Sequence, residues 1–93
     1  MAIRLITYDL NKERSKKFDY DGFYKFIKNH AWARLSESSY AIETNASPSA
    51  IFSQLQSYVD ENDHVLVMTL TSPFYGQHKQ EVLDWLQERL QIG

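Results

Sequence analysis

The sequence predicts an α+β fold, in which an antiparallel sheet packs against helices. Three observations lead to it. Segments with strand-like and helix-like apolar spacing alternate along the chain. The first strand, residues 2–9, is apolar on both faces, as in strands that are covered from both sides. Ser47 followed by Pro48 is typical of a helix start, because Ser caps the first turn and Pro lacks an N–H that this turn does not use.

The N-terminal part of the chain predicts a strand, a charged loop and a helix. The strand covers residues 2–9 and the loop covers residues 10–18. The helix begins near Asp19 or Asp21, either of which is a suitable cap, and it ends near residues 29–30. One apolar stripe at helical spacing runs along it, made of Phe23, Phe26, Ile27 and His30.

Residues 32–44 predict extended structure. Their side chains alternate, with Ser38, Tyr40 and Ile42 on one face and Ser39, Ala41 and Glu43 on the other. Residues 36–39 hold either a tight turn that separates two short strands or a bend within one long ribbon. The sequence is compatible with both.

The C-terminal half predicts a helix, a strand, a loop and a last helix. The first helix begins at Pro48 and carries apolar residues as far as Val59, and residues 60–63 end it. A strand over residues 64–71 follows, and a loop covers residues 72–76. The last helix is expected over residues 77–91, with a broad apolar stripe made of Val82, Leu83, Trp85, Leu86 and Leu90.

Two strands in the middle complete a βαββαβ pattern, which is that of a ferredoxin-like domain with an added C-terminal helix. Residues 1–93 are then a single domain, with a core over about residues 1–72. Two helices cover one face of the antiparallel sheet. The other face needs the last helix, a partner chain, or both, because the first strand is apolar on both sides.

Composition narrows the class of protein. The chain has no cysteine, which excludes disulfides and thiolate metal sites. No apolar run reaches the roughly 18 residues that span a bilayer, and the N-terminus lacks a signal-peptide pattern. We therefore expect a soluble, cytoplasmic protein that does not enter membranes.

Charge is distributed unevenly along the chain. The net charge is −2, but residues 1–34 carry +4 and residues 35–93 carry −6. This asymmetry predicts a basic patch on an acidic protein. The alternative is that short, solvated segments differ by chance.

The first candidate site is Asp9, at the end of the first strand. A metal-dependent phosphodiesterase needs carboxylates to hold Mg²⁺, so Asp9 is a candidate metal ligand and catalytic residue. A single carboxylate per chain becomes a pair if two chains meet at a two-fold axis. The alternative is an ordinary strand-end aspartate that accepts backbone hydrogen bonds in a turn.

The second candidate site is the basic loop that follows Asp9. Its cations suit sequence-independent contacts with nucleic-acid phosphates, and the alternative is a solvated loop. Arg34 and Lys28 extend this patch if the fold brings them near it. The loop cations are Lys12, Arg14, Lys16 and Lys17.

The histidines do not form a metal motif. No His-x-His or His-x-x-x-His pair exists among His30, His64 and His78. His30 lies on the apolar stripe of its helix, so we expect it to be packed and hydrogen-bonded. His64 opens a predicted strand, and His78 opens a predicted helix.

Three segments resemble the CRISPR-associated Cas-two endonucleases and the virulence-associated protein D superfamily. The first is Tyr8-Asp9-Leu10 with the charged loop and helix behind it. The second is the ribbon over residues 32–43, in which Ser38 or Ser39 matches the serine of the family. The third is the helix and strand that close at Thr71. Together they cover about residues 1–72.

This resemblance implies a ferredoxin-like homodimer whose sheets face each other. It also implies that Asp9 is the metal-site aspartate near the dimer axis, with Mg²⁺ as the metal. Other members of the family act without nuclease activity, as scaffolds. The helix over residues 77–91 replaces the additional strand with which the nucleases end, which favours a divergent, stand-alone member.

Two functional hypotheses follow. In the first, a homodimer binds nucleic acid and, in its catalytic form, acts as a weak metal-dependent endonuclease. In the second, the chain is a non-catalytic interaction or scaffold protein. The acidic C-terminal half and Trp85 then form the partner surface, unless Trp85 packs over the sheet.

Overall fold

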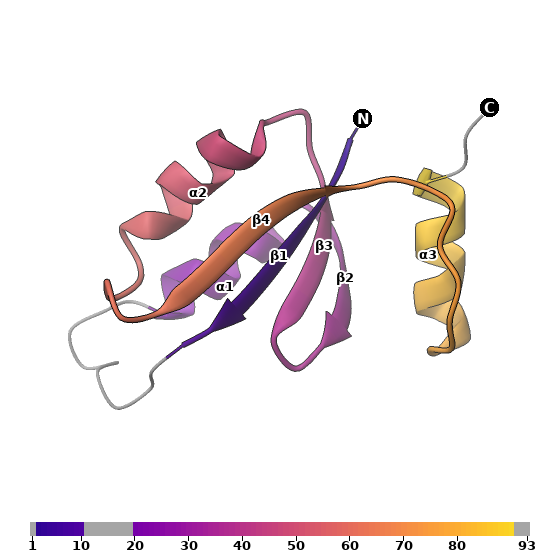
Figure 1. The fold of residues 1–93 in the computed structure, drawn as a ribbon, viewed down its shortest axis with the longest axis horizontal. Helices are drawn as coiled ribbons and strands as arrows, with labels where there is room; N and C mark the ends of the chain where they lie inside the picture. The colour runs from indigo at the N-terminus through magenta and orange to yellow at the C-terminus, as the bar shows by residue number, and fades with distance from the viewer. Residues whose placement is uncertain (1, 11–19, 91–93) are drawn as a thin grey trace.

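A computed structural model describes residues 2–10 and 20–90 of the chain. The four strands form one antiparallel sheet in the order β2-β3-β1-β4 (Figure 1). This α+β arrangement is compatible with a ferredoxin-like fold. The elements in chain order are β1 (Ile3–Asp9), α1 (Tyr20–Lys28), β2 (Ala31–Ser36), β3 (Ser39–Glu43), α2 (Pro48–Gln56), β4 (His64–Leu70) and α3 (Gln80–Leu90).

The middle ribbon is two strands rather than one bent strand. β2 and β3 pair in antiparallel fashion, with an irregularity between Arg34 and Ser36. Serine side chains hold the turn between them. The hydroxyls of Ser36 and Ser39 lie 2.7 Å apart, and the backbone N–H of Ser38 donates to Ser36 Oγ across 3.2 Å. β2 is an edge strand of the sheet and pairs with β3.

Helices α1 and α2 cover one face of the sheet, as expected (Figure 1). Phe23 and Ile27 of α1 are fully buried, which confirms that the predicted stripe faces the core. His30 Nδ1–H donates to the carbonyl oxygen of Phe26 across 3.0 Å, so this histidine is packed and hydrogen-bonded. The buried residues of this layer are Ile6, Tyr8, Phe23, Ile27, Tyr40, Ile42, Ile51 and Leu55.

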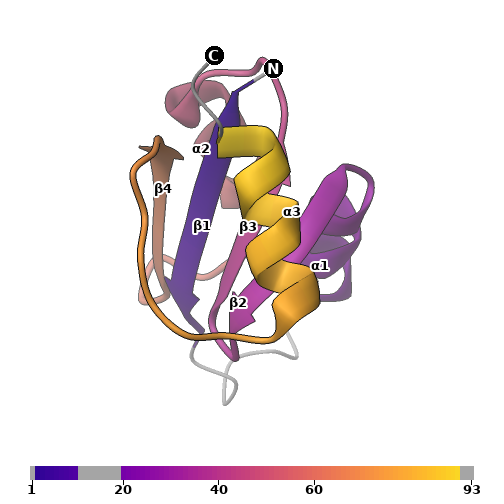
Figure 2. The same cartoon turned by 90° about the vertical axis from the view of Figure 1, so that its right-hand side faces the viewer.

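Helix α3 lies on the other face of the sheet, where it covers part of the apolar surface (Figure 2). Trp85 is partly buried against this second cluster, so it packs over the sheet. β4 lies at the side that α3 leaves open, and Leu66 and Met68 on it are 62% and 43% exposed. The buried residues beneath α3 are Ile3, Ala41, Val82, Leu86 and Leu90.

Helix α2 begins as predicted and ends earlier than predicted. Ser47 Oγ accepts from the backbone N–H of Ala50 across 3.1 Å, with Pro48 in the first turn. The expectation that the helix reaches Val59 is wrong, because it ends at Gln56. The backbone N–H of Tyr58 donates to the carbonyl oxygen three residues earlier across 2.9 Å, which tightens the last turn and stops the helix.

Helix α3 also begins later than predicted, at Gln80 rather than at residue 77. The side chain of His78 accounts for the difference. Its Nδ1 accepts from the backbone N–H of Lys79 across 2.8 Å. The backbone N–H groups of Val82 and Leu83 then donate to the carbonyl oxygen of Lys79, so the first turn starts there. The predicted end at residue 91 lies outside the described residues.

Candidate functional site

Asp9 is exposed at the end of β1, and His64 of β4 is its cross-strand partner. A magnesium ion prefers several oxygen ligands. Within residues 2–10 and 20–90, however, no group of three or more histidine, aspartate or glutamate side chains is placed to hold a metal ion. Within these residues Asp9 is therefore a single exposed carboxylate, and a pair of such carboxylates would require a second chain.

Of the predicted phosphate contacts, the structure describes Arg34. The four loop cations, Lys12, Arg14, Lys16 and Lys17, lie outside the described residues. Arg34 lies on the edge strand β2, and its side chain is exposed. The prediction that Arg34 extends the basic patch of the loop is therefore not tested by the described residues.

The guanidinium of Arg34 is held at the end of β2 by the turn that follows it. Its Nε–H donates to the carbonyl oxygen of Ser36 across 3.2 Å. One of its terminal nitrogens donates to the carbonyl oxygen of Glu37 across 3.3 Å. Its Cζ lies 5.8 Å from the ring centre of Tyr40. These contacts fix the cation in place and leave its remaining N–H donors for a ligand.

Tyr8 supports the same turn from within the core. Its hydroxyl donates to the carbonyl oxygen of Glu37 across 3.3 Å, so this oxygen accepts from both Tyr8 and Arg34. Burial raises the pKa of Tyr8 above its ordinary value, and the neighbouring Tyr24 raises it further. Tyr8 is therefore a neutral hydrogen-bond donor at physiological pH, and it stabilises the carbonyl group that positions Arg34.

Trp32 stands on the same strand, two residues before Arg34. The side chain is 40% exposed. The ring contacts Tyr40, with 5.6 Å between the ring centres. Nζ of Lys28 from α1 lies 5.2 Å from the centre of the indole. An exposed aromatic ring therefore has one cation, Lys28, over it and a second, Arg34, two residues along the same strand.

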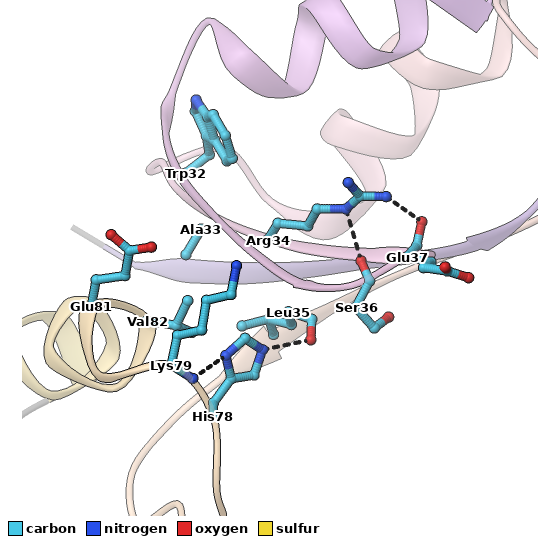
Figure 3. A pocket seen from close by; sticks show the side chains of 10 residues that line it. All are labelled: Trp32, Ala33, Arg34, Leu35, Ser36, Glu37, His78, Lys79, Glu81 and Val82. Carbon is cyan, nitrogen blue, oxygen red and sulfur yellow. Dashed lines mark hydrogen bonds between the residues drawn. The ribbon is translucent and has the colours of Figure 1, made fainter.

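The imidazole of His78 ties the start of α3 to the edge of β2. Because the backbone N–H of Lys79 donates to Nδ1, this nitrogen carries no proton. The proton is therefore on Nε2, which donates to the carbonyl oxygen of Leu35 across 2.8 Å. This arrangement places Lys79 beside β2 (Figure 3).

Trp32, Arg34, His78 and Lys79 line one groove of about 660 Å³ between the edge of β2 and the start of α3. In Figure 3 the cationic ends of Lys79 and Arg34 occupy the middle of the view, and the carboxylates of Glu81 and Glu37 lie at its two sides. Residues 32–37 form one wall, and the other wall is formed by His78, Lys79, Glu81 and Val82.

The cations of the groove differ from Arg89 at the other end of α3. Arg89 Nε lies 3.4 Å from a carboxylate oxygen of Glu43, and its Cζ lies 4.2 Å from the ring centre of Trp85. Within the described part of the chain, the groove cations Arg34 and Lys79 form no ion pair with a carboxylate. Arg89 therefore fastens α3 to the sheet, whereas the groove cations are available to an anionic ligand.

Two residues of this site were not predicted from the sequence. Trp32 belongs to a segment that carried the family resemblance, but it had no assigned role. Lys79 lies in the acidic half of the chain, which gave no sign of a basic patch. Their proximity depends on α3 returning to β2, about 43 residues after Leu35 in the sequence.

No protein-family model matches the chain. The resemblance to the Cas-two and virulence-associated proteins therefore rests on the three sequence segments and stays a prediction. In the described residues, no helix combines the length and the apolar character needed to cross a membrane.

Proposed function

We propose that the chain binds nucleic acid along the edge of β2. The observation that carries this proposal is the placement of Arg34, a predicted phosphate contact, in one groove with Lys79 and the exposed Trp32. Cations without carboxylate partners suit phosphate groups, and an adjacent aromatic ring suits bases. The two hydrogen bonds from Arg34 to the turn hold the cation ready for a ligand.

A binding titration with a single variant tests this proposal. Arg34→Gln keeps a polar side chain and removes the charge, so the affinity for an oligonucleotide should fall and its dependence on salt should become weaker by about one phosphate contact. Lys25→Gln is the matched control, because Lys25 is an exposed cation of α1 that does not line the groove. Equal effects of the two variants would count against the groove, since they indicate only a general loss of charge.

We further propose a ferredoxin-like homodimer with Asp9 near its two-fold axis. The strand order and the two helices on one face support this fold. Asp9 shares its face of the sheet with His64, Leu66 and Met68, because side chains alternate along a strand and these residues pair in register with β1. An apolar contact between two copies of this face would bring the two Asp9 carboxylates toward each other.

The catalytic part of this second proposal has its own test. Metal-dependent cleavage requires Mg²⁺ and both Asp9 side chains, so Asp9→Ala should abolish cleavage of RNA or DNA and leave the dimer intact. Size-exclusion chromatography with light scattering checks the dimer. Cleavage that persists in Asp9→Ala would remove this aspartate from the chemistry. If the wild-type chain binds nucleic acid without cleaving it, the catalytic proposal is wrong and only the binding function remains.

A further inference from the structure

The exposed indole of Trp32 is held in one orientation. Tyr40 contacts its ring from the neighbouring strand, and Lys28 lies over it from α1. Both partners come from regular elements, so the ring is a preformed surface rather than a free side chain. It remains 40% exposed and lines the groove (Figure 3). A planar ligand at the groove would therefore meet an indole whose position is already set by α1 and β3.

The groove beside the ring is lined by two cations, Arg34 and Lys79, and by two carboxylates, Glu37 and Glu81. A nucleotide combines a flat base with an anionic phosphate, and proteins bind single strands with aromatic rings for the first and cations for the second. Trp32 provides the ring, and Arg34 and Lys79 provide cations that have no ion pair among the described residues. The volume of about 660 Å³ lies within the range of small-ligand pockets.

We infer that Trp32 stacks with one unpaired base of a single-stranded nucleic acid, whose adjacent phosphate groups lie against Arg34 and Lys79. A base inside a duplex is stacked on both sides, so its face is closed to an indole unless the base is extruded. This inference rests on the proposed binding function, and it adds that the groove selects single strands over duplexes.

Fluorescence anisotropy with two labelled probes tests the inference. One probe is an oligothymidylate of about ten nucleotides, which is within the site size of single-strand binders, and the other is a blunt DNA duplex of the same length. The wild-type chain should prefer the single strand. Trp32→Ala should weaken single-strand binding roughly 5- to 100-fold, and Trp32→Phe should restore much of it. Neither variant should change binding of the duplex.

Phe52→Ala is the matched control for these variants. Phe52 is 37% exposed, close to the exposure of Trp32, but it lies on α2 and does not line the groove. Its removal should leave both affinities unchanged. An equal loss in Phe52→Ala and Trp32→Ala would contradict stacking at Trp32.

A fluorescence measurement keeps the inference testable if Trp32→Ala fails to fold. The chain has two tryptophans, so in Trp85→Phe the emission comes from Trp32 alone. Stacking with a base should quench this emission as oligothymidylate is added. Saturable binding without any change in the emission would contradict the inference.

The outcomes separate this inference from the proposed function. Binding of both probes with equal affinity, lost in Arg34→Gln but retained in Trp32→Ala, would uphold nucleic-acid binding and overturn stacking. No binding of either probe would overturn both. Free thymidine monophosphate should compete at concentrations at least roughly a hundredfold above those of the oligonucleotide, because it offers one phosphate without neighbouring contacts. Equal potency of the two competitors would indicate a mononucleotide site and contradict the single-strand assignment.

Discussion

His78 Nε2 lies 2.8 Å from the carbonyl oxygen of Leu35, so the residue that precedes Lys79 is hydrogen-bonded to the edge strand of the sheet. The same ring accepts from the N–H of Lys79. One side chain thus determines where α3 begins, and it also places a cation beside β2. The candidate groove exists because of this contact between segments that are distant in the sequence.

Replacement of His78 by alanine should therefore destabilise the start of α3. A hydrogen bond of this kind contributes about 1 kcal/mol to the free energy of unfolding. We expect a smaller loss for His78→Ala, because His78 is exposed to solvent. Hydrogen exchange at the Lys79 amide should become faster, and urea titration should show a small loss in the free energy of unfolding. His64→Ala is the control, since His64 is an exposed strand residue with no hydrogen bond from its ring within the described structure. An unchanged Lys79 exchange rate in His78→Ala would contradict the proposed role of the ring.

Stability should fall at alkaline pH through Tyr20. Its hydroxyl donates to a carboxylate oxygen of Asp63 across 2.7 Å. Burial and the hydrogen bond to Asp63 together raise the pKa of Tyr20 from its ordinary value of 10 to about 12. Because the folded-state pKa is the higher one, the contribution is complete below about pH 10 and is lost as the pH rises toward 12.

Urea titrations of the wild-type chain and of Tyr20→Phe measure this contribution. The difference in the free energy of unfolding between the two should shrink as the pH rises from about 10 to 12, because the phenylalanine variant has no hydroxyl to ionise. A difference that stays constant across this interval would show that Tyr20 ionises equally in the folded and unfolded chains.

The acidic residues of the groove should weaken the binding of polyanions. Glu37 and Glu81 line the groove at the sides of the Arg34 and Lys79 cations (Figure 3). Replacement of either glutamate by glutamine removes a like-charge repulsion, so oligonucleotide affinity should increase by a few-fold at low salt and less at high salt. Glu61→Gln is an exposed control that lies outside this groove. An increase of the same size in all three variants would indicate a general effect of net charge.

The open part of the sheet face should mediate dimer formation. Leu66 and Met68 are exposed there, whereas α3 covers the apolar residues Ile3 and Ala41 on the same side. A lysine at position 66 places like charges opposite each other in a two-fold contact, so Leu66→Lys should shift the chain toward the monomer. Light scattering measures the mass, and Phe52→Lys is the control on α2. A wild-type chain that is monomeric at all accessible concentrations would overturn the dimer proposal.

Local signals in the sequence predicted the elements well, and the site less so. The start of α2 was correct because Ser47 and Pro48 act on their own first turn. The start of α3 was wrong by three residues, since the imidazole of His78 competes with a helical turn there. The spacing of apolar residues along the sequence gives no information about such a side-chain contact.

The candidate site shows the same limit. Arg34 was predicted as a phosphate contact, but Lys79 was not. Arg34 lies on β2 and Lys79 directly precedes α3, so only the tertiary fold brings the two residues into one groove. The sequence also left three ways to cover the second face of the sheet. The structure shows that α3 covers part of it, a choice that depends on packing across the sheet rather than on local pattern.

The most direct test of nucleic-acid binding at the edge of β2 is a titration of the ¹⁵N-labelled chain with oligothymidylate, followed by amide chemical shifts. Residues 31–37 and 78–82, which form the groove and its ends, should shift together and saturate with one dissociation constant. The shifts should disappear in Arg34→Gln/Lys79→Gln. Binding that leaves residues 31–37 and 78–82 unperturbed would contradict the account.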